Sequence, residues 1–132
     1  MTVLVDRPQT PTKVWTSACP LDVLLPGRGV TVLLPGKEQA ALFLLPDDTL
    51  AAVSNIDPFG RAAVMSRGLT GDRKGEPTVA SPLGKQVFSL RDGRCLDDPG
   101  GAAQRGESNH ESRALTIYEV RVTHGIVEIA RR

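Results

Sequence analysis

The chain is poor in aromatic residues, in histidine and cysteine, and in net charge. Its 132 residues include one Trp, one Tyr, three Phe, two His and two Cys, and the formal net charge is only +1. A protein that binds nucleic acid by neutralising phosphates usually carries a clear basic excess and aromatic side chains that stack on bases. The composition therefore argues against nucleic-acid binding, and it offers no polybasic segment for a membrane surface.

Long apolar runs are missing as well. No stretch approaches the roughly 18 uninterrupted apolar residues of a membrane-spanning helix, and the first residues lack the basic and apolar regions of a signal peptide. We therefore expect a cytoplasmic protein that does not associate with membranes. In that reducing compartment Cys19 and Cys95 are expected to stay reduced. Together with His110 and His124 they are too scattered to predict a zinc site.

The length and the residue pattern predict one domain of the all-β class. A hydrophobic content of 40% is sufficient for one core, and 13 Gly and 10 Pro favour many tight turns. We expect a single domain over residues 13–132, preceded by a flexible N-terminal extension at 1–12. Residues 99–114 are expected to form a mobile loop, because they contain almost no large apolar side chain.

Short apolar runs separated by turn signals predict antiparallel strands. Three neighbouring runs form an expected meander whose near-continuous apolar character indicates burial on both faces. A type I′ turn is expected at Asp92-Gly93 and a hairpin turn at Thr123-His124-Gly125, whereas residues 55–75 are expected to form a loop. The expected strands are Lys13–Ala18, Val30–Leu34, Gln39–Leu45, Leu50–Ser54, Pro77–Ala80, Gln86–Leu90, Leu115–Val122 and Ile126–Ala130, with a helical turn at Leu21–Leu25 and a return strand from Cys95.

The familiar catalytic motifs are absent. The sequence contains no phosphate-binding P-loop, no Gly-x-Gly-x-x-Gly fingerprint and no Gly-x-Ser-x-Gly elbow. The two histidines fall in an expected loop and an expected turn, so a Ser–His dyad has no obvious base. We therefore predict no catalytic residue and no metal ligand in this chain.

Two proline-containing segments between the expected strands are the most informative part of the sequence. The first runs from Ser54 to Gly60, and the second from Ser81 to Leu96. They can be interpreted as two ordinary loops. They also resemble the cluster-binding loops of a Rieske iron–sulfur domain, where a Cys-x-His motif is followed by Cys-Pro-x-His, a Phe and an Asp-Gly-Arg turn. The resemblance implies a Rieske-like antiparallel β-sandwich or barrel, with a small loop-rich subdomain at the position of the cluster.

The resemblance does not extend to the ligands of the cluster. A Rieske centre needs two thiolates and two imidazoles, whereas the matching positions hold Asn55, Asp57, Ser81 and Gly84. Serine cannot replace a thiolate, Asp57 is a hard oxygen donor, and Gly84 has no side chain. These four residues are therefore expected to be vestigial ligand positions, and we expect no cofactor in this chain.

A cluster-less version of this fold occurs in the small subunit of the cytoplasmic NAD(P)H-dependent assimilatory nitrite reductase. The chain is similar to that family from about Val14 to Ile129, and the similarity depends chiefly on the spacing of Asp57-Pro58-Phe59, Ser66-Arg67-Gly68 and Ser81-Pro82-Leu83. The N-terminal extension and the length of the 99–114 loop depart from the family pattern, although neither touches the informative loops.

The resemblance implies a non-catalytic small subunit of an oxidoreductase complex. That complex uses NAD(P)H to reduce nitrite to ammonium in nitrate assimilation. Its FAD, 4Fe-4S cluster and sirohaem belong to the large subunit, which is the expected partner. The chain alone is expected to be inactive. Three alternatives stay open: a cluster-less Rieske-like adaptor of another oxidoreductase, an electron-transfer module with another cofactor, and a small enzyme that uses Asp57 and Asp72 as a carboxylate pair.

The resemblance also implies where the large subunit binds. In cluster-bearing relatives the two loops form a tip that meets redox partners, so we expect an apolar centre with a charged rim there. Phe59 is either the anchor of that surface or a core residue that packs the loop. Asp57 either contributes to it or holds its loop in an Asx turn or a salt bridge. Asp57 and Ser81 are also expected to bond backbone amides across the site of the missing cluster. Arg73 and Lys74 are further candidates for the charged rim, and the alternative for all of the basic residues is that they form an ordinary solvated surface. The expected partner-binding residues are Asp57, Pro58, Phe59, Arg61, Arg67, Pro82, Leu83 and Lys85.

Overall fold

The computed structural model of the chain describes residues 13–96 and 114–132, whose regular structure consists of strands and short 3₁₀ turns. The all-β prediction is confirmed. The expected extension at 1–12, most of the expected loop at 99–114, and His110 lie outside the described residues. No helix in the described ranges is long and apolar enough to cross a membrane. The strands are β1 (Thr16–Pro20), β2 (Gly29–Leu34), β3 (Glu38–Leu44), β4 (Leu50–Ser54), β5 (Leu69–Arg73), β6 (Glu76–Ala80), β7 (Val87–Ser89), β8 (Ile117–Thr123) and β9 (Ile126–Arg131), and the turns are η1 (Leu21–Val23), η2 (Pro35–Lys37) and η3 (Met65–Arg67).

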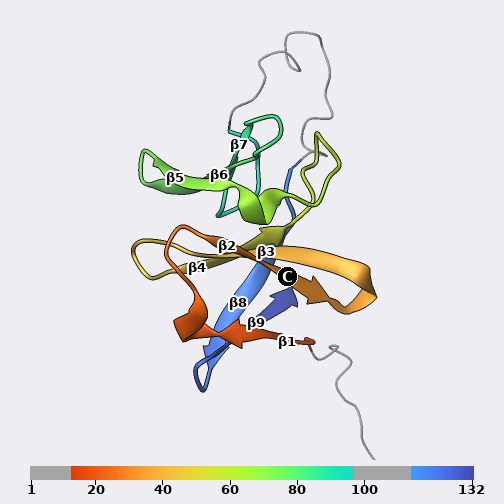
Figure 1. The fold of residues 1–132 in the computed structure, drawn as a ribbon, viewed down its shortest axis with the longest axis vertical. Coiled ribbons are helices and arrows are strands. Elements are labelled where there is room, and N and C mark those ends of the chain that lie inside the picture. Colours follow the sequence, from red (N-terminus) through yellow and green to blue (C-terminus); the bar gives the residue numbers. More distant parts are fainter. Residues whose placement is uncertain (1–12, 97–113) are drawn as a thin grey trace, which may run out of the picture.

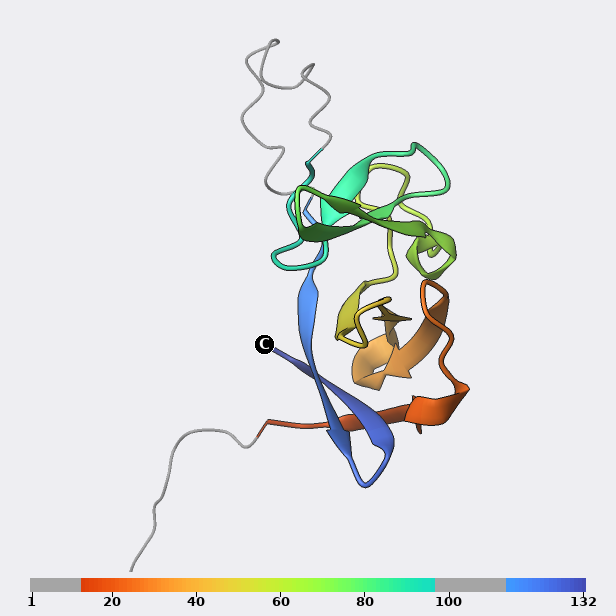
Figure 2. The ribbon, with the colours of Figure 1, turned by 90° about the vertical axis from the view of Figure 1, so that its left-hand side faces the viewer.

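Two antiparallel sheets make up the fold (Figures 1 and 2). The larger sheet has the strand order β1-β9-β8-β4-β3-β2, and its edge strands β1 and β2 approach each other, so that it nearly closes into a barrel. The smaller sheet has the order β5-β6-β7 and lies beside β2, β3 and β4, with η3 between the sheets. The loops after β4 and β6 therefore belong to one small subdomain.

Strands β3 and β4 divide their side chains between two cores. Ala41, Phe43 and Val53 face the smaller sheet, whereas Ala40 and Leu42 face the interior of the larger one. All five side chains are inaccessible to solvent. The predicted burial on both faces is confirmed for β3 and β4. It is wrong for β2, where Thr31 and Leu33 are exposed on one face. The first core also includes Met65, Val79, Phe88 and Leu115, and the second includes Leu24, Val32, Tyr118, Val127 and Ile129.

The expectation of one long loop at residues 55–75 is wrong. This range contains η3 and the whole of β5, which pairs with β6 from Leu69 opposite Ala80 to Arg73 opposite Glu76. Every residue of β5 except Thr70 is exposed. The residues of β5 show no apolar alternation that would predict a strand. Its place in the sheet comes from backbone pairing with β6. The return strand expected from Cys95 is reduced to a single bridge with Phe88.

The type I′ geometry lies at other turns than the one expected. Such a turn requires a positive φ at both central residues, and Asp92 does not have one. Its carboxylate instead accepts a hydrogen bond of 3.0 Å from the N–H of Arg94. Both central residues have positive φ in the β5–β6 hairpin at Lys74-Gly75 and in the β8–β9 hairpin at His124-Gly125.

Candidate functional site

Two five-residue loops of the small subdomain have the same backbone hydrogen bonds. The first loop (57–61) follows β4, the second loop (81–85) follows β6, and we call them together the loop pair. The carbonyl of Asp57 accepts the N–H of Arg61 at 2.7 Å, and the carbonyl of Ser81 accepts the N–H of Lys85 at 3.0 Å. The N–H of Asp57 donates to the carbonyl of Ala62, and the N–H of Ser81 donates to the carbonyl of Gln86, both at 2.9 Å. Each loop is thus closed twice by its own backbone.

Asp57 and Ser81 join the two loops. Both residues are almost completely buried, and the Ser81 hydroxyl donates a hydrogen bond to Oδ2 of Asp57. The other carboxylate oxygen of Asp57 accepts the N–H groups of Phe59 and Gly60 at 2.7 and 3.1 Å, and Ser81 Oγ accepts the N–H of Leu83 at 3.2 Å. Each side chain therefore bonds amides within its own loop, and the bond that crosses between the loops joins the two side chains. Asp57 holds its loop in an Asx turn and has no exposed surface to offer a partner.

The other two positions that we predicted to match cluster ligands, Asn55 and Gly84, are also packed against other residues of the protein. Asn55 is buried, donates from Nδ2 to Oε1 of Gln39 at 3.0 Å and accepts the N–H of Ser66 at 2.7 Å. At Gly84, a Cβ atom would lie 2.2 Å from Oε1 of Gln86. That oxygen is buried and has no hydrogen-bond partner among the described residues. The side chain of Gln86 therefore occupies the space that any side chain at position 84 would need.

These four positions do not fit a Rieske cluster. The cluster requires two thiolates and two imidazoles, whereas the site offers an amide, a carboxylate and a hydroxyl that already bond protein groups, and a glycine without a side chain. Within residues 13–96 and 114–132, no group of three His, Cys, Asp or Glu side chains is placed to hold a metal ion. The loop pair keeps a defined shape through hydrogen bonds in place of metal–ligand bonds.

The expected partner-binding residues differ in their exposure. Arg61, Arg67, Pro82, Leu83 and Lys85 are exposed, and Arg67 belongs to η3 and lies outside the loop pair.

Phe59 and Pro58 are only partly exposed. The ring of Phe59 packs against the first core, 6.1 Å from the ring of Phe88, which matches the alternative that it packs its loop. Leu83 is 52% exposed, and its Cδ1 lies 2.7 Å from where a Cβ of Gly60 would be. Leu83 is therefore the large apolar side chain that the loop pair presents to solvent.

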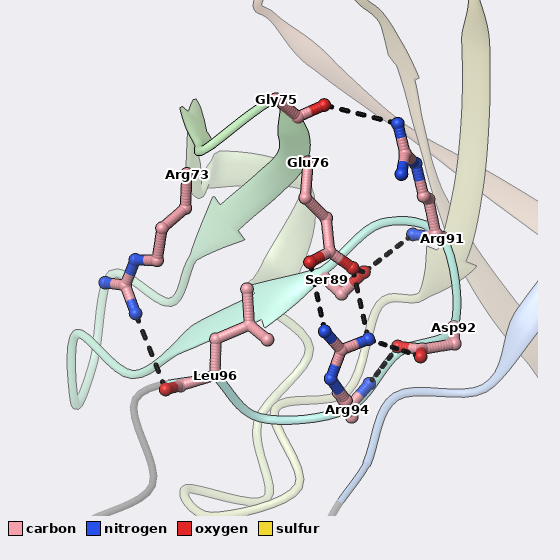
Figure 3. Close-up of polar contacts among 8 residues, drawn as sticks. All are labelled: Arg73, Gly75, Glu76, Ser89, Arg91, Asp92, Arg94 and Leu96. Atoms are coloured by element: carbon pink, nitrogen blue, oxygen red, sulfur yellow. Dashed lines mark hydrogen bonds and ion pairs between the residues drawn. The ribbon is translucent and has the colours of Figure 1, made fainter.

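An ion-pair network connects β6, β7 and the turn that follows β7 (Figure 3). The guanidinium of Arg94 contacts both carboxylate oxygens of Glu76 at 3.0 and 3.1 Å and also pairs with Asp92. The hydroxyl of Ser89 donates to Glu76 at 2.5 Å. Ser89 and then Arg94 hold the pKa of Glu76 below its ordinary value. The Asp-Gly-Arg turn is visible in the sequence, but nothing in the sequence indicates that its arginine pairs with Glu76 in β6.

The comparisons with known proteins agree with this geometry. The model of the Rieske-like [2Fe-2S] domain family matches residues 14–130. A nitrite reductase (NADH) small subunit of Escherichia coli K12 is 42% identical over 116 residues, which are 87% of this chain and 95% of that protein. The chain belongs to the Rieske-like family of nitrite reductase small subunits.

Further relatives of this small-subunit family support the assignment. A crystal structure from Mycobacterium tuberculosis, provisionally assigned as an NADH-dependent nitrite reductase small subunit, has a TM-score of 0.79 at 48% identity and covers 92% of this chain and 98% of that one. The expected Rieske-like fold is thereby confirmed. These homologues are small subunits of an oxidoreductase complex. The chain also matches a nitrite reductase [NAD(P)H] large subunit of Klebsiella oxytoca, at 38% identity over 126 residues that are 96% of this chain and 12% of that protein.

Proposed function

We propose that this chain is the non-catalytic small subunit of an NAD(P)H-dependent nitrite reductase and docks on the large subunit of that enzyme. The observation that carries the proposal is the match to the Klebsiella oxytoca large subunit, in which a domain similar to 96% of this chain is a small part of one long polypeptide. Fusion keeps a domain at a high effective concentration beside its neighbours. A separate chain of the same family can reach the same arrangement by docking.

The large subunit supplies the redox chemistry in this proposal. Its FAD, 4Fe-4S cluster and sirohaem carry electrons from NAD(P)H to nitrite, which is reduced to ammonium in cytoplasmic nitrate assimilation. The small chain contributes a surface, because the site that would hold a cluster in a Rieske protein is filled by protein hydrogen bonds.

The loop pair is the proposed docking surface. Pro58 and Phe59 are partly exposed, and Arg61, Pro82, Leu83 and Lys85 are exposed, with Arg67 in the neighbouring η3. An apolar centre with a polar rim is the usual composition of a protein interface. Asp57 is a positioning residue in this proposal, since its buried carboxylate fixes the loop without touching the partner.

A pull-down tests the proposal. The full chain is tagged and captured from cells grown on nitrate, and the eluate is examined by visible spectroscopy and by NAD(P)H oxidation with nitrite. We expect a large partner with sirohaem absorbance and nitrite-dependent NAD(P)H oxidation. A Leu83→Asp variant should lose this partner. A Leu33→Asp variant should keep it, because Leu33 is 69% exposed on β2, outside the loop pair. A partner without sirohaem would instead favour an adaptor of another oxidoreductase, and the absence of any partner would contradict docking.

A further inference from the structure

The two loops share a residue pattern as well as a hydrogen-bond pattern. The first reads Asp-Pro-Phe-Gly-Arg and the second reads Ser-Pro-Leu-Gly-Lys. Each has a buried acceptor at its first position, proline at the second, an apolar residue at the third, glycine at the fourth and a cation at the fifth. The first residues, Asp57 and Ser81, bond each other. The loop pair is therefore a repeated local pattern whose two starting residues are joined by a hydrogen bond.

The cations at the fifth positions are held in an uncommon backbone conformation. Arg61 has φ 61° and Lys85 has φ 63°, and both side chains are exposed. A positive φ is disfavoured for residues with a Cβ and persists where the surroundings enforce it. Here the enforcing contacts are the two backbone hydrogen bonds that close each loop. Both cations thus leave the backbone from equivalent, fixed positions.

Apolar groups belong to the same loops as the two cations. Leu83 of the second loop covers Gly60 of the first, and Pro58 and Pro82 occupy the second position of each loop. The buried bond between Asp57 and Ser81 lies beneath them. A surface that is rigid before it binds loses less conformational entropy on association than a flexible one. The loop pair is therefore organised for contact in advance.

We propose that the loop pair recognises an acidic surface of the large subunit, with Arg61 and Lys85 as the two charges that orient the docked chain. The proposal rests on the proposed function and adds the chemistry of the partner surface. Two cations at equivalent positions beside exposed Leu83 fit an apolar patch with carboxylates on either side of it. Exposed interface charges act mainly on the association rate and on its dependence on salt.

The test removes both charges and keeps both backbone conformations. The full chain carrying Arg61→Asn and Lys85→Asn is compared with the parent chain for its Kd to the purified holo large subunit. Asparagine is used because it tolerates positive φ better than other residues with a Cβ. The matched control carries Lys37→Asn and Lys74→Asn, since both lysines are exposed, have φ of 68° and 55°, and lie in hairpins outside the loop pair. Lys74 is one of the rim candidates named from the sequence, but the β5–β6 turn that contains it lies on the opposite side of the small subdomain from the first loop (Figure 1). Lys74 therefore serves as a control.

We expect the loop-pair variant to bind about tenfold more weakly than the parent at low salt, with the difference shrinking as salt screens the charges. The control should stay within about twofold of the parent. Parent-like binding by the loop-pair variant, or an equal loss in the control, would overturn the proposal while leaving docking intact. Failure of the parent chain to bind the large subunit would overturn the proposed function together with this inference. Thermal melts of all three chains distinguish a loss of binding from a loss of folding.

Discussion

Replacing Asp57 by Ala removes the buried acceptor that joins the two loops. The carboxylate accepts hydrogen bonds from the Ser81 hydroxyl and from the N–H groups of Phe59 and Gly60. Alanine leaves all three donors without this acceptor. We expect Asp57→Ala to destabilise the fold and to weaken binding to the large subunit, because the loops lose the contact that fixes their relative position.

The size of the effect follows from the burial of each donor. An unsatisfied buried donor costs about 1–3 kcal/mol, and that cost applies to the Ser81 hydroxyl and in part to the N–H of partly buried Phe59. Gly60 is exposed, so water can replace the acceptor of its N–H at little cost. The total is about 3 kcal/mol, which corresponds to a decrease in Tm of roughly 10 °C for a domain of this size.

Thermal denaturation of the Asp57→Ala, Ser81→Ala and double variants measures the loss of stability and the interaction energy between Asp57 and Ser81. We expect a coupling of about 1–2 kcal/mol between the two sites, since they share one hydrogen bond. Asp57→Asn is the conservative control, because its amide oxygen can still accept the N–H of Phe59, and it should lose less. If Asp57→Ala lowered the Tm by less than about 2 °C and left binding to the large subunit unchanged, the buried carboxylate would not be what holds the two loops together.

Three further predictions concern other parts of the chain. The folded-state pKa of Glu76 is lowered, chiefly by the hydrogen bond from Ser89. The stabilising contribution of Glu76 is therefore present above its unfolded pKa and is lost as the pH falls through its folded pKa. Glu76→Gln should flatten the loss of stability on the acid side of the unfolded pKa of glutamate in acid titrations of unfolding. Gly29→Ala should cost about 2–3 kcal/mol in denaturant unfolding, because its Cβ would lie 2.2 Å from a backbone oxygen. Gly71→Ala, whose Cβ would meet a side chain at 3.3 Å, should cost less than about 1 kcal/mol, and equal losses would contradict this. Burial raises the pKa of the Cys19 thiol. In a Cys95→Ser variant, iodoacetamide should therefore react with Cys19 more slowly at neutral pH than with the thiol of a small peptide. An equal rate would contradict the burial of Cys19.

The sequence predicted the parts of the fold that depend on apolar patterning. The meander of β2, β3 and β4 appears within one or two residues of its expected bounds, because β3 and β4 are buried on both faces and β2 is buried on one. Strand β5 was missed because its residues are polar and exposed. The Asp92-Gly93 turn was misjudged because the carboxylate of Asp92 bonds a backbone N–H and stabilises another geometry.

The candidate site was predictable only in part. The resemblance predicted which four positions match the cluster ligands, and the chemistry of their side chains argues against cluster ligation. The bond between Asp57 and Ser81 was beyond sequence reasoning, because these residues are 24 positions apart and their distance is set by how the small sheet packs on β3 and β4. The exposure of Leu83 and the burial of Phe59 depend on the same packing.

The alternation of β3 between two cores has a consequence for unfolding. Phe43 belongs to the core beneath the loop pair and Leu42 to the interior of the larger sheet. A slip of β3 by one residue would exchange their sides, so neither core can rearrange without disrupting the other. Segments coupled in this way open together and not as separate cooperative units. The backbone amides at the base of the loop pair should therefore exchange with solvent deuterium only when the larger sheet also opens.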